Sequence, residues 1–379
     1  MIVLIALDFF GQGAVSRGAR QQVRALLDAG HRVTVITDSD DGRHKFFIKD
    51  RRENNLQITV VWTINLPRYS LFGKEVSFAA SCSKALLKLS KTEAINLVIS
   101  QVSTVCFGLA PLAKWKKIPA VFVIRALIKD RLLNLASHYD WPTTQLYKLT
   151  NRYAVSKMPF LLAVSNYMKQ LAISEGAKSE HVFVLHNPVD TQRFHPNGHT
   201  IKDIDILFIG RLSIEKGVGD FLRAAKQLSA STRIVIIGDG GLRKKLEDQA
   251  NHLQCEIDFK GWIDNELLPQ YIRRSMIQVV PSISEPQGRV VLEAMACGVP
   301  VVGADTGGIP EMIIHRVNGW LVPPNDPQSL ANTIKQVLSD EKKRKAAGQA
   351  ALETARYFSV DQYNKKLVRI YHIIMRLRS

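Results

Sequence analysis

The chain has 379 residues, of which 46% are hydrophobic and 22% charged, which is ordinary globular composition and enough length for about two domains. No apolar run approaches the roughly 18 to 20 residues of a membrane-spanning helix, so we expect no integral membrane segment. The four cysteines are far apart and form no Cys-x-x-Cys pair, which argues against a disulfide framework or a zinc module and favours a cytoplasmic protein.

The net charge of +17 is unevenly distributed along the chain. Residues 1–195 contain 26 Lys and Arg against 14 Asp and Glu, so this half carries +12. A surface of this kind attracts anionic lipid, phosphorylated substrates or nucleic acid, because the field of clustered charges adds up. The sign of the charge is informative, but it does not identify the partner.

In the first half of the chain, short β-branched runs alternate with helical patterns. Residues 2–7 predict a buried first strand, residues 16–29 a helix that ends at Gly30, and residues 33–37 a second strand. Further strands are predicted at 97–100, 120–124, 160–164 and 182–185. This order predicts an open, mostly parallel sheet in a first domain of residues 1–195.

Turn-forming residues at 195–200 predict a linker, after which a second α/β series begins. Its strands are predicted at 205–209, 233–237, 257–260, 277–280 and 299–302, so that residues 196–360 form a second domain. Residues 361–379 carry apolar side chains at helical spacing. We expect them to form an amphipathic helix that packs back on the body, with membrane insertion as the alternative.

The first chemical motif is the segment 282–302, SISEPQGRVVLEAMACGVPVV, which predicts a polar turn and a helix that starts near Gly288. In an open α/β sheet, a helix that starts after the carboxyl end of a strand presents free amides to anionic ligands. Glu285 lies in the turn and Glu293 in the helix, so one cleft can hold both carboxylates at different ends of a ligand. Taken alone, two such glutamates are more often solvated surface charges.

The second motif is Gly210-Arg211-Leu212-Ser213-Ile214-Glu215-Lys216-Gly217, which directly follows the predicted strand at 205–209. Arg211 and Lys216 place two cations at a strand end, where they neutralise a pyrophosphate, Arg by bidentate contact and Lys as a point charge. A solvated basic turn is the alternative interpretation. Both motifs belong to the same edge of one predicted sheet.

Together the two motifs resemble the donor-binding domain of glycosyltransferase family 4, whose fold is called GT-B. Residues 210–217 are similar to the family's Gly-Arg-Leu-x-x-Glu-Lys-Gly, and Glu285 to Glu293 is similar to its Glu-x7-Glu. Further matches lie at 187–190, 193–194, 261–263, 306–311 and 318–324. The resemblance implies an α/β protein of two Rossmann-like domains facing across a cleft, and a retaining hexosyltransferase that uses a nucleotide-diphosphate sugar.

The resemblance also implies a role for each motif residue. Arg211 and Lys216 would hold the diphosphate, Glu285 would contact the donor sugar, and Glu293 would bind the ribose hydroxyls. The other expected donor contacts are Gly13 near the phosphates, Trp262 and Ile263 near the base, and the amides of Gln287, Gly288, Arg289 and Val290. We expect no cofactor besides the donor and no metal, since no His, Asp and Glu grouping has ligand spacing.

Three positions depart from the family pattern and affect the first domain most. Arg125 stands where many relatives have His, Gln287 replaces a commonly apolar residue, and Ala14 replaces the second Gly of a pair. These departures leave the acid or base of the first domain unassigned.

The expected partners are a nucleotide sugar and a lipid-linked or glycan acceptor, in cell-surface polysaccharide or glycolipid synthesis. Basic and apolar stretches at 44–49, 51–52 and 114–117 predict that the first domain docks on an anionic acceptor or on the anionic inner face of the membrane, as a peripheral protein. A solvated basic face that keeps a cytoplasmic protein soluble is the alternative. A dehydrogenase is disfavoured because Gly11-x-Gly13 lacks the third glycine of a dinucleotide loop. We expect no nucleic acid partner, since no stacking motif or zinc module is present, whereas a non-catalytic GT-B-like nucleotide-sugar-binding protein stays open as an alternative.

Overall fold

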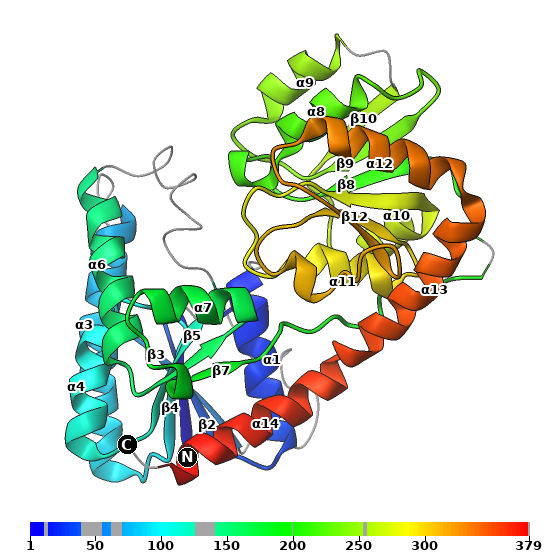
Figure 1. The fold of residues 1–379 in the computed structure, drawn as a ribbon. Helices are drawn as coiled ribbons and strands as arrows, with labels where there is room; N and C mark the ends of the chain where they lie inside the picture. Colours follow the sequence, from blue (N-terminus) through cyan, green and yellow to red (C-terminus); the bar gives the residue numbers. More distant parts are fainter. Residues whose placement is uncertain are drawn as a thin grey trace. The chain divides into compact units, whose positions relative to one another are not determined.

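A computed structural model describes residues 1–10, 14–38, 55–61, 70–125, 141–198, 200–252 and 256–377. Within these ranges the chain forms two compact units. The N-terminal unit runs to Leu185 and takes in the end of the chain from Tyr363, and the C-terminal unit comprises His186–Gln362. Each unit is an α/β structure around its own parallel sheet (Figure 1).

The sheet of the N-terminal unit has, within the described residues, seven parallel strands in the order β3-β2-β1-β4-β5-β6-β7. The strands are β1 (Ile2–Ile5), β2 (Val33–Thr37), β3 (Leu56–Val60), β4 (Leu97–Ser100), β5 (Ala120–Ile124), β6 (Phe160–Ala163) and β7 (Val182–Val184). The helices are α1 (Ala14–Asp28), α3 (Ser70–Thr92), α4 (Cys106–Lys116), α6 (Trp141–Lys157), α7 (Asn166–Ser174), the short η2 (Ser179–His181) and α14 (Val360–Arg376).

Helices cover both faces of this sheet, because its central strands are buried on both sides. The side chains of α3, α4, α6 and α7 form one core with one face of the strands. On the other face, α1 packs beside α14, which buries Tyr363, Leu367, Tyr371 and Ile374 (Figure 1). The prediction that the C-terminal helix packs back on the body is therefore confirmed, and its apolar side faces the protein core.

The sheet of the C-terminal unit has the strand order β10-β9-β8-β11-β12-β13, again all parallel in the described part. Its strands are β8 (Ile204–Ile209), β9 (Arg233–Ile237), β10 (Glu256–Gly261), β11 (Ser275–Val280), β12 (Val301–Ala304) and β13 (Gly319–Val322). Its helices are η3 (Ile214–Lys216), α8 (Val218–Ala225), α9 (Arg243–Ala250), α10 (Leu268–Arg274), α11 (Arg289–Ala296), η4 (Ile309–Glu311), α12 (Pro327–Ser339) and α13 (Glu341–Tyr357).

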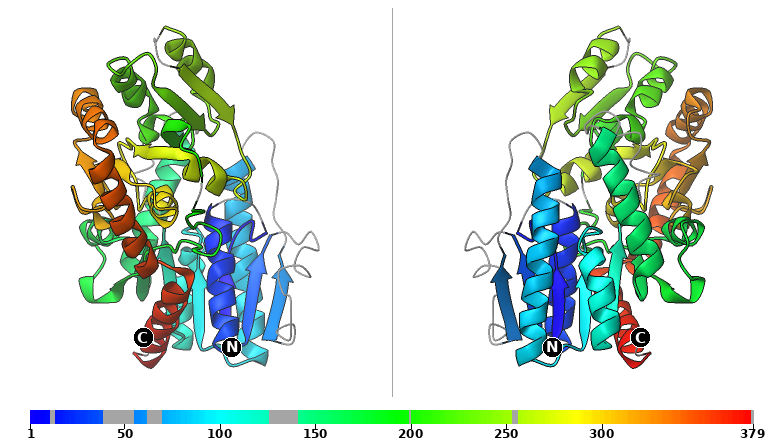
Figure 2. Two further views of the ribbon diagram at one scale, coloured as in Figure 1. Left: turned by 90° about the vertical axis from the view of Figure 1, so that its right-hand side faces the viewer. Right: turned by 90° about the vertical axis from the view of Figure 1, so that its left-hand side faces the viewer.

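This second sheet also has a core on each face. Helices α10, α11 and α13 pack on one side, and α8, α9 and α12 on the other. Val189 and Phe194 belong to the first of these cores, so the residues that precede the expected linker at 195–200 pack with the C-terminal unit. Figure 2 shows the layers of both units from two further directions.

The strand order places the two motifs next to each other. Strand β8 pairs with β9 on one side and with β11 on the other, so the order of the strands reverses at β8. Ligands of open α/β sheets bind at the carboxyl ends of the strands at such a switch point. The loop that carries residues 210–217 follows β8, and the loop that carries Glu285 follows β11.

The buried thiols of the described residues are not reactive ones. Cys82, Cys106 and Cys297 are buried and unbridged. Burial raises the pKa of all three thiols, that of Cys297 to about 12. Cys255 lies outside the described residues. Across the described ranges, no helix combines the length and the apolar character that crossing a membrane requires.

Candidate functional site

The loops after β8 and β11 are joined by backbone contacts at the switch point. The amide of Ile283 donates to the carbonyl of Glu215 at 2.8 Å. Gly217 has φ +66°, and a Cβ on it would lie 1.9 Å from the carbonyl oxygen of Pro281. Only glycine combines this left-handed backbone with so close an approach of two chains. The two predicted motifs therefore form one rigid structural feature.

An ion pair connects the functional side chains of these loops. Lys216 Nζ lies 2.5 Å from Glu285 Oε2, and the two side chains are 26% and 11% exposed. Charge-assisted contacts of this kind are short and directional, more so where water is partly excluded. The family resemblance implies that the cation binds a diphosphate and the carboxylate a sugar, and the structure brings the two groups into direct contact.

Arg211 lies on the same loop, one residue after Gly210 at the end of β8. Its side chain is exposed, and no described residue forms a hydrogen bond or an ion pair with its guanidinium. An exposed guanidinium and a partly buried ammonium on one loop suit an anionic ligand with two charged groups. Of the two cations of this loop, Lys216 is thus paired internally and Arg211 is open to a ligand.

Glu293 lies one turn inside α11, the helix that begins directly after the Glu285 loop. Gly288 has φ +94°, a conformation that favours glycine, and it turns the chain into the helix at Arg289. The carboxylate of Glu293 is 7% exposed and has the Arg289 guanidinium 3.7 Å away. The pair thus places a cation beside the buried carboxylate in the first turns of the helix.

Gln287 has a structural role that the sequence did not reveal. Its side chain is buried, and its Oε1 accepts hydrogen bonds from the backbone N and the Nδ2 of Asn187, at 2.6 and 2.8 Å. Its Nε2 donates to the carbonyl of Asn187 at 3.0 Å. These contacts explain why a polar residue occupies this position, and they leave the backbone amide as the group for the predicted donor contact.

The loop after β12 covers the backbone of Glu285. The amide of Gly308 donates to the Glu285 carbonyl at 2.9 Å, and a Cβ on Gly307, which has φ +59°, would lie 1.9 Å from that same oxygen. Glu311 at the end of this loop accepts from His186 Nε2 at 2.7 Å. The residues 306–311, which sequence analysis matched without assigning a role, hold the donor loop in place.

The loops after β9 and β10 complete this edge of the sheet. The amide of Leu212 donates to the carbonyl of Asp239 at 2.9 Å, and that of Gly238 donates to the carbonyl of Gly261 at 2.8 Å. Trp262 follows directly and is 70% exposed, whereas Ile263 packs against the core. An exposed tryptophan at a strand end provides a flat apolar surface of the kind that stacks on a base.

In the N-terminal unit, Gly13 lies outside the described residues and Arg125 is described. Arg125 follows β5, and its Nε donates to Gln101 Oε1 at 3.0 Å. Its guanidinium packs against α1, where a Cβ on Gly18 would lie 2.4 Å from Nη1. The residue at the family's histidine position is thus held by neighbours in its own unit. Among the described residues, no cluster of three or more His, Cys, Asp or Glu has the geometry of a metal site.

Two family models match the chain. The model described as "Glycosyltransferase Family 4" matches residues 15–193, and the model described as "Glycosyl transferases group 1" matches residues 190–354. The first covers most of the N-terminal unit, and the second covers the loops that carry Arg211, Lys216, Glu285 and Glu293. Together they span nearly the whole chain.

Individual glycosyltransferases are also similar to this chain in sequence or in structure. An uncharacterized glycosyltransferase of Methanocaldococcus jannaschii, MJ1607, is 36% identical over 177 residues. The match covers 45% of this chain and 45% of that relative, so it spans about half of the relative's length. Glycogen synthase of Mycobacterium tuberculosis is 27% identical over 366 residues, 91% of this chain and 86% of that protein. The crystal structure of Anabaena HepE in complex with UDP has a TM-score of 0.76 at 21% identity and covers 98% of this chain and 99% of that chain.

Proposed function

Because the chain belongs to glycosyltransferase family 4 and has the GT-B fold, we propose that it is a retaining hexosyltransferase that takes its sugar from a nucleotide-diphosphate donor. The observation that carries this proposal is the contact of Lys216 with Glu285 at 2.5 Å, in a loop that also carries the exposed Arg211. It provides a site for an anionic leaving group next to a carboxylate suited to sugar hydroxyls. A structure of Anabaena HepE contains UDP-glucose, which supports a UDP-sugar as the donor to test first.

The donor diphosphate competes with Glu285 for the Lys216 ammonium. In the proposed complex, Arg211 and Lys216 bind the diphosphate, and Glu285 turns to a hydroxyl of the sugar. Breaking the bond between the anomeric carbon and the diphosphate builds negative charge on the leaving phosphate, which the two cations stabilise. Positive charge develops at the anomeric carbon, where the carboxylate of Glu285 orients the sugar or stabilises the charge.

Transfer with retention follows from attack by the acceptor on the face that the diphosphate leaves. A retaining glycosidase instead needs two carboxylates about 5 Å apart at the anomeric centre, one of them a free nucleophile. Glu285 is ion-paired with Lys216 in the described site, which suits a group that orients the sugar better than a nucleophile. The anomeric configuration of the product, read by NMR, tests this assignment.

The remaining donor contacts are proposed from the same loops. Glu293 binds the ribose hydroxyls, with Arg289 beside it at 3.7 Å, and the base lies near Trp262 and Ile263. The amides of residues 287–290 and Gly13 approach the sugar and the phosphates. We propose that cations of the protein, rather than a metal, neutralise the diphosphate, so that transfer persists in excess chelator.

The acceptor is proposed to be a lipid-linked carrier or a glycan, in cell-surface polysaccharide or glycolipid synthesis. The positive charge of residues 1–195 supports an anionic acceptor or membrane surface and a peripheral position on the cytoplasmic side. A panel of labelled nucleotide sugars, tested for binding and then with lipid and glycan acceptors, tests the whole proposal. Binding of a nucleotide sugar with neither hydrolysis nor transfer would favour the non-catalytic binding protein instead.

A further inference from the structure

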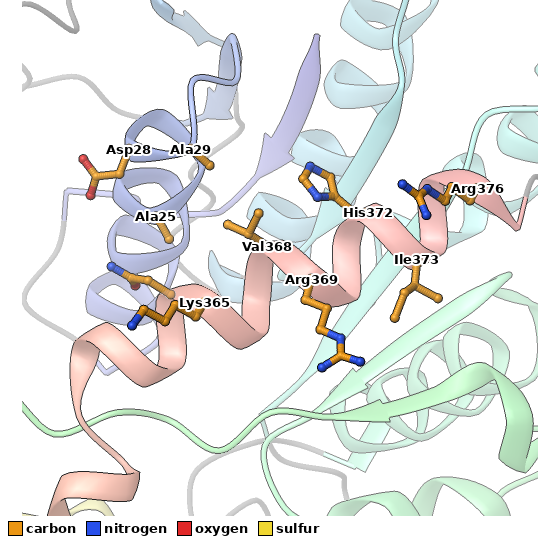
Figure 3. A pocket seen from close by; sticks show the side chains of 10 residues that line it. Ala25, Asp28, Ala29, Lys365, Val368, Arg369, His372, Ile373 and Arg376 are labelled. Carbon is orange, nitrogen blue, oxygen red and sulfur yellow. The ribbon is translucent and has the colours of Figure 1, made fainter.

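A groove of about 720 Å³ lies within the N-terminal unit, between α14 and the last turns of α1. The α1 side of the groove consists of Ala25, Asp28 and Ala29, and α14 contributes Lys365, Arg369 and Arg376 among others (Figure 3). None of these residues belongs to the loops of the proposed donor site. The groove is therefore a separate feature that the transfer reaction does not explain.

One face of α14 is strongly cationic. Residues 365, 369, 372 and 376 follow one another at helical spacing, and all four side chains are exposed. This face lies opposite the buried one, which carries Tyr363, Leu367, Tyr371 and Ile374. Asp361 is the one carboxylate of α14, and it lies in the first turn. On an ordinary solvent-exposed surface, positive and negative side chains are usually interspersed, unlike on this face of α14.

Internal interactions do not account for these cations. No described residue forms a hydrogen bond or an ion pair with Lys365, Arg369 or Arg376. Like charges spaced four residues apart, as at 365 and 369, repel each other on a helix. The helix dipole favours a cation in the last turn, such as Arg376, but not Lys365 in the first half of α14. A bound anion would relieve this repulsion.

The groove reaches the edge of the seven-stranded sheet at which the strands begin. His372 on α14 contacts His31, just before β2, with 3.1 Å between their Nε2 atoms. Backbone bonds join the starts of the strands at this edge, with Ile2 N donating to Arg32 O at 2.9 Å and Val98 N to Pro119 O at 2.9 Å. The groove and the end of α4, just before β5, therefore share this edge.

The end of α4 carries a second basic and apolar patch on the same edge. Trp115 is 69% exposed, and Lys114, Lys116 and Lys117 surround it in the chain. Near the groove, Ile373 and Leu377 of α14 are 39% and 54% exposed, and Figure 3 shows Ile373 projecting from α14 on the same side as Arg369. Two patches that combine cations with exposed apolar side chains at one edge match an extended anionic surface better than a small soluble anion.

Building on the peripheral position proposed above, we propose that this edge docks the N-terminal unit on an anionic bilayer, with the phosphates of acidic lipid headgroups lying along the α1–α14 groove beside Lys365, Arg369 and Arg376. Ile373, Leu377 and Trp115 enter the interfacial region, and Lys114, Lys116 and Lys117 add attraction to the anionic leaflet. The long apolar face of α14 stays in the protein core, so the helix lies on the membrane and does not insert.

Co-sedimentation of the full-length protein with vesicles tests this docking. We expect binding to phosphatidylcholine vesicles that contain phosphatidylglycerol, and none to phosphatidylcholine alone. The variant Lys365→Gln/Arg369→Gln/Arg376→Gln should bind more weakly on the order of 100-fold, because each basic side chain beside an anionic leaflet is worth about five-fold. The charge-matched control, Lys244→Gln/Lys245→Gln/Lys335→Gln, removes three exposed lysines of the C-terminal unit and should bind like the unmodified protein.

Each further outcome supports or overturns the proposal. Equal binding of the groove variant and the control, or equal binding to both kinds of vesicle, would overturn it. Displacement of the protein from vesicles by millimolar inorganic phosphate would assign the groove to a soluble anion and overturn the membrane assignment. If the triple variant unfolds early, Arg369→Gln alone should still weaken vesicle binding about five-fold. UDP affinity should not change in the groove variant, so failure of the docking proposal is distinguishable from failure of the proposed function.

Discussion

The substitution Glu285→Gln separates two effects of the same side chain. Glu285 and Lys216 are 2.5 Å apart, with the lysine side chain 26% exposed. Ion pairs with that much solvent contact are worth about 1 kcal/mol. If, as proposed, the diphosphate competes with Glu285 for Lys216, removing the carboxylate charge should tighten UDP binding by about 1 kcal/mol, roughly five-fold. Turnover should fall by about two orders of magnitude, as for loss of one preorganised electrostatic contact.

Two assays on the same protein preparation measure these opposite effects. Isothermal titration with UDP gives the affinity, and transfer from a labelled UDP-sugar gives the turnover number. Glu353→Gln removes an exposed carboxylate on α13 and should change neither quantity. Weaker UDP binding by Glu285→Gln would refute the competition for Lys216, and an unchanged turnover number would refute the role of Glu285 at the sugar.

Three further substitutions test other parts of the site and the fold. Glu293→Gln should weaken UDP binding about ten-fold and the binding of inorganic pyrophosphate less. Equal losses of affinity for both probes would argue against a ribose contact. Gln287→Leu removes the three hydrogen bonds between the buried Gln287 side chain and Asn187 and should cost about 2 to 3 kcal/mol in urea unfolding, so a change near zero would contradict that role. Partial burial lowers the pKa of His31, and the neighbouring His372 lowers it further. The unfolded chain then binds that proton more readily, so thermal stability should decrease as the pH falls below about 6.5, and His31→Gln should flatten this dependence.

Much of the fold follows from local sequence patterns. The strands at 33–37, 97–100, 120–124 and 233–237 form at the predicted residues. Each is a short run rich in β-branched residues, which favours a strand over a helix. Strand β12 begins at Val301 rather than 299, since Pro300 has no amide to donate to the ladder. The edge strands β3 and β13 were missed, because β3 is only half-buried and β13 lies in a segment interpreted as a family motif.

The sequence predicted that the two motif loops lie at one edge of the sheet, but it did not predict the contacts between their side chains. Topology alone brings Lys216 and Glu285, 69 positions apart in the chain, to one switch point. The two motifs indicate which side chains contact a ligand. They do not indicate that Lys216 and Glu285 also form an ion pair with each other. The partner of Gln287 is Asn187, 100 positions away, and it depends on how the loops fold over each other. Contacts of this kind require the structure.

The central claim is that Arg211 and Lys216 bind the diphosphate of a nucleotide-sugar donor. Its most direct test is titration of the variant Arg211→Ala/Lys216→Ala with the UDP-sugar that the unmodified protein transfers. Each lost charge-assisted contact is worth about 1.5 to 3 kcal/mol, so donor affinity should fall at least 100-fold. The unfolding temperature should fall by only a few degrees, since Arg211 is exposed and the ion pair of Lys216 with Glu285 is worth about 1 kcal/mol. A double variant that binds the donor as tightly as the unmodified protein would contradict the account.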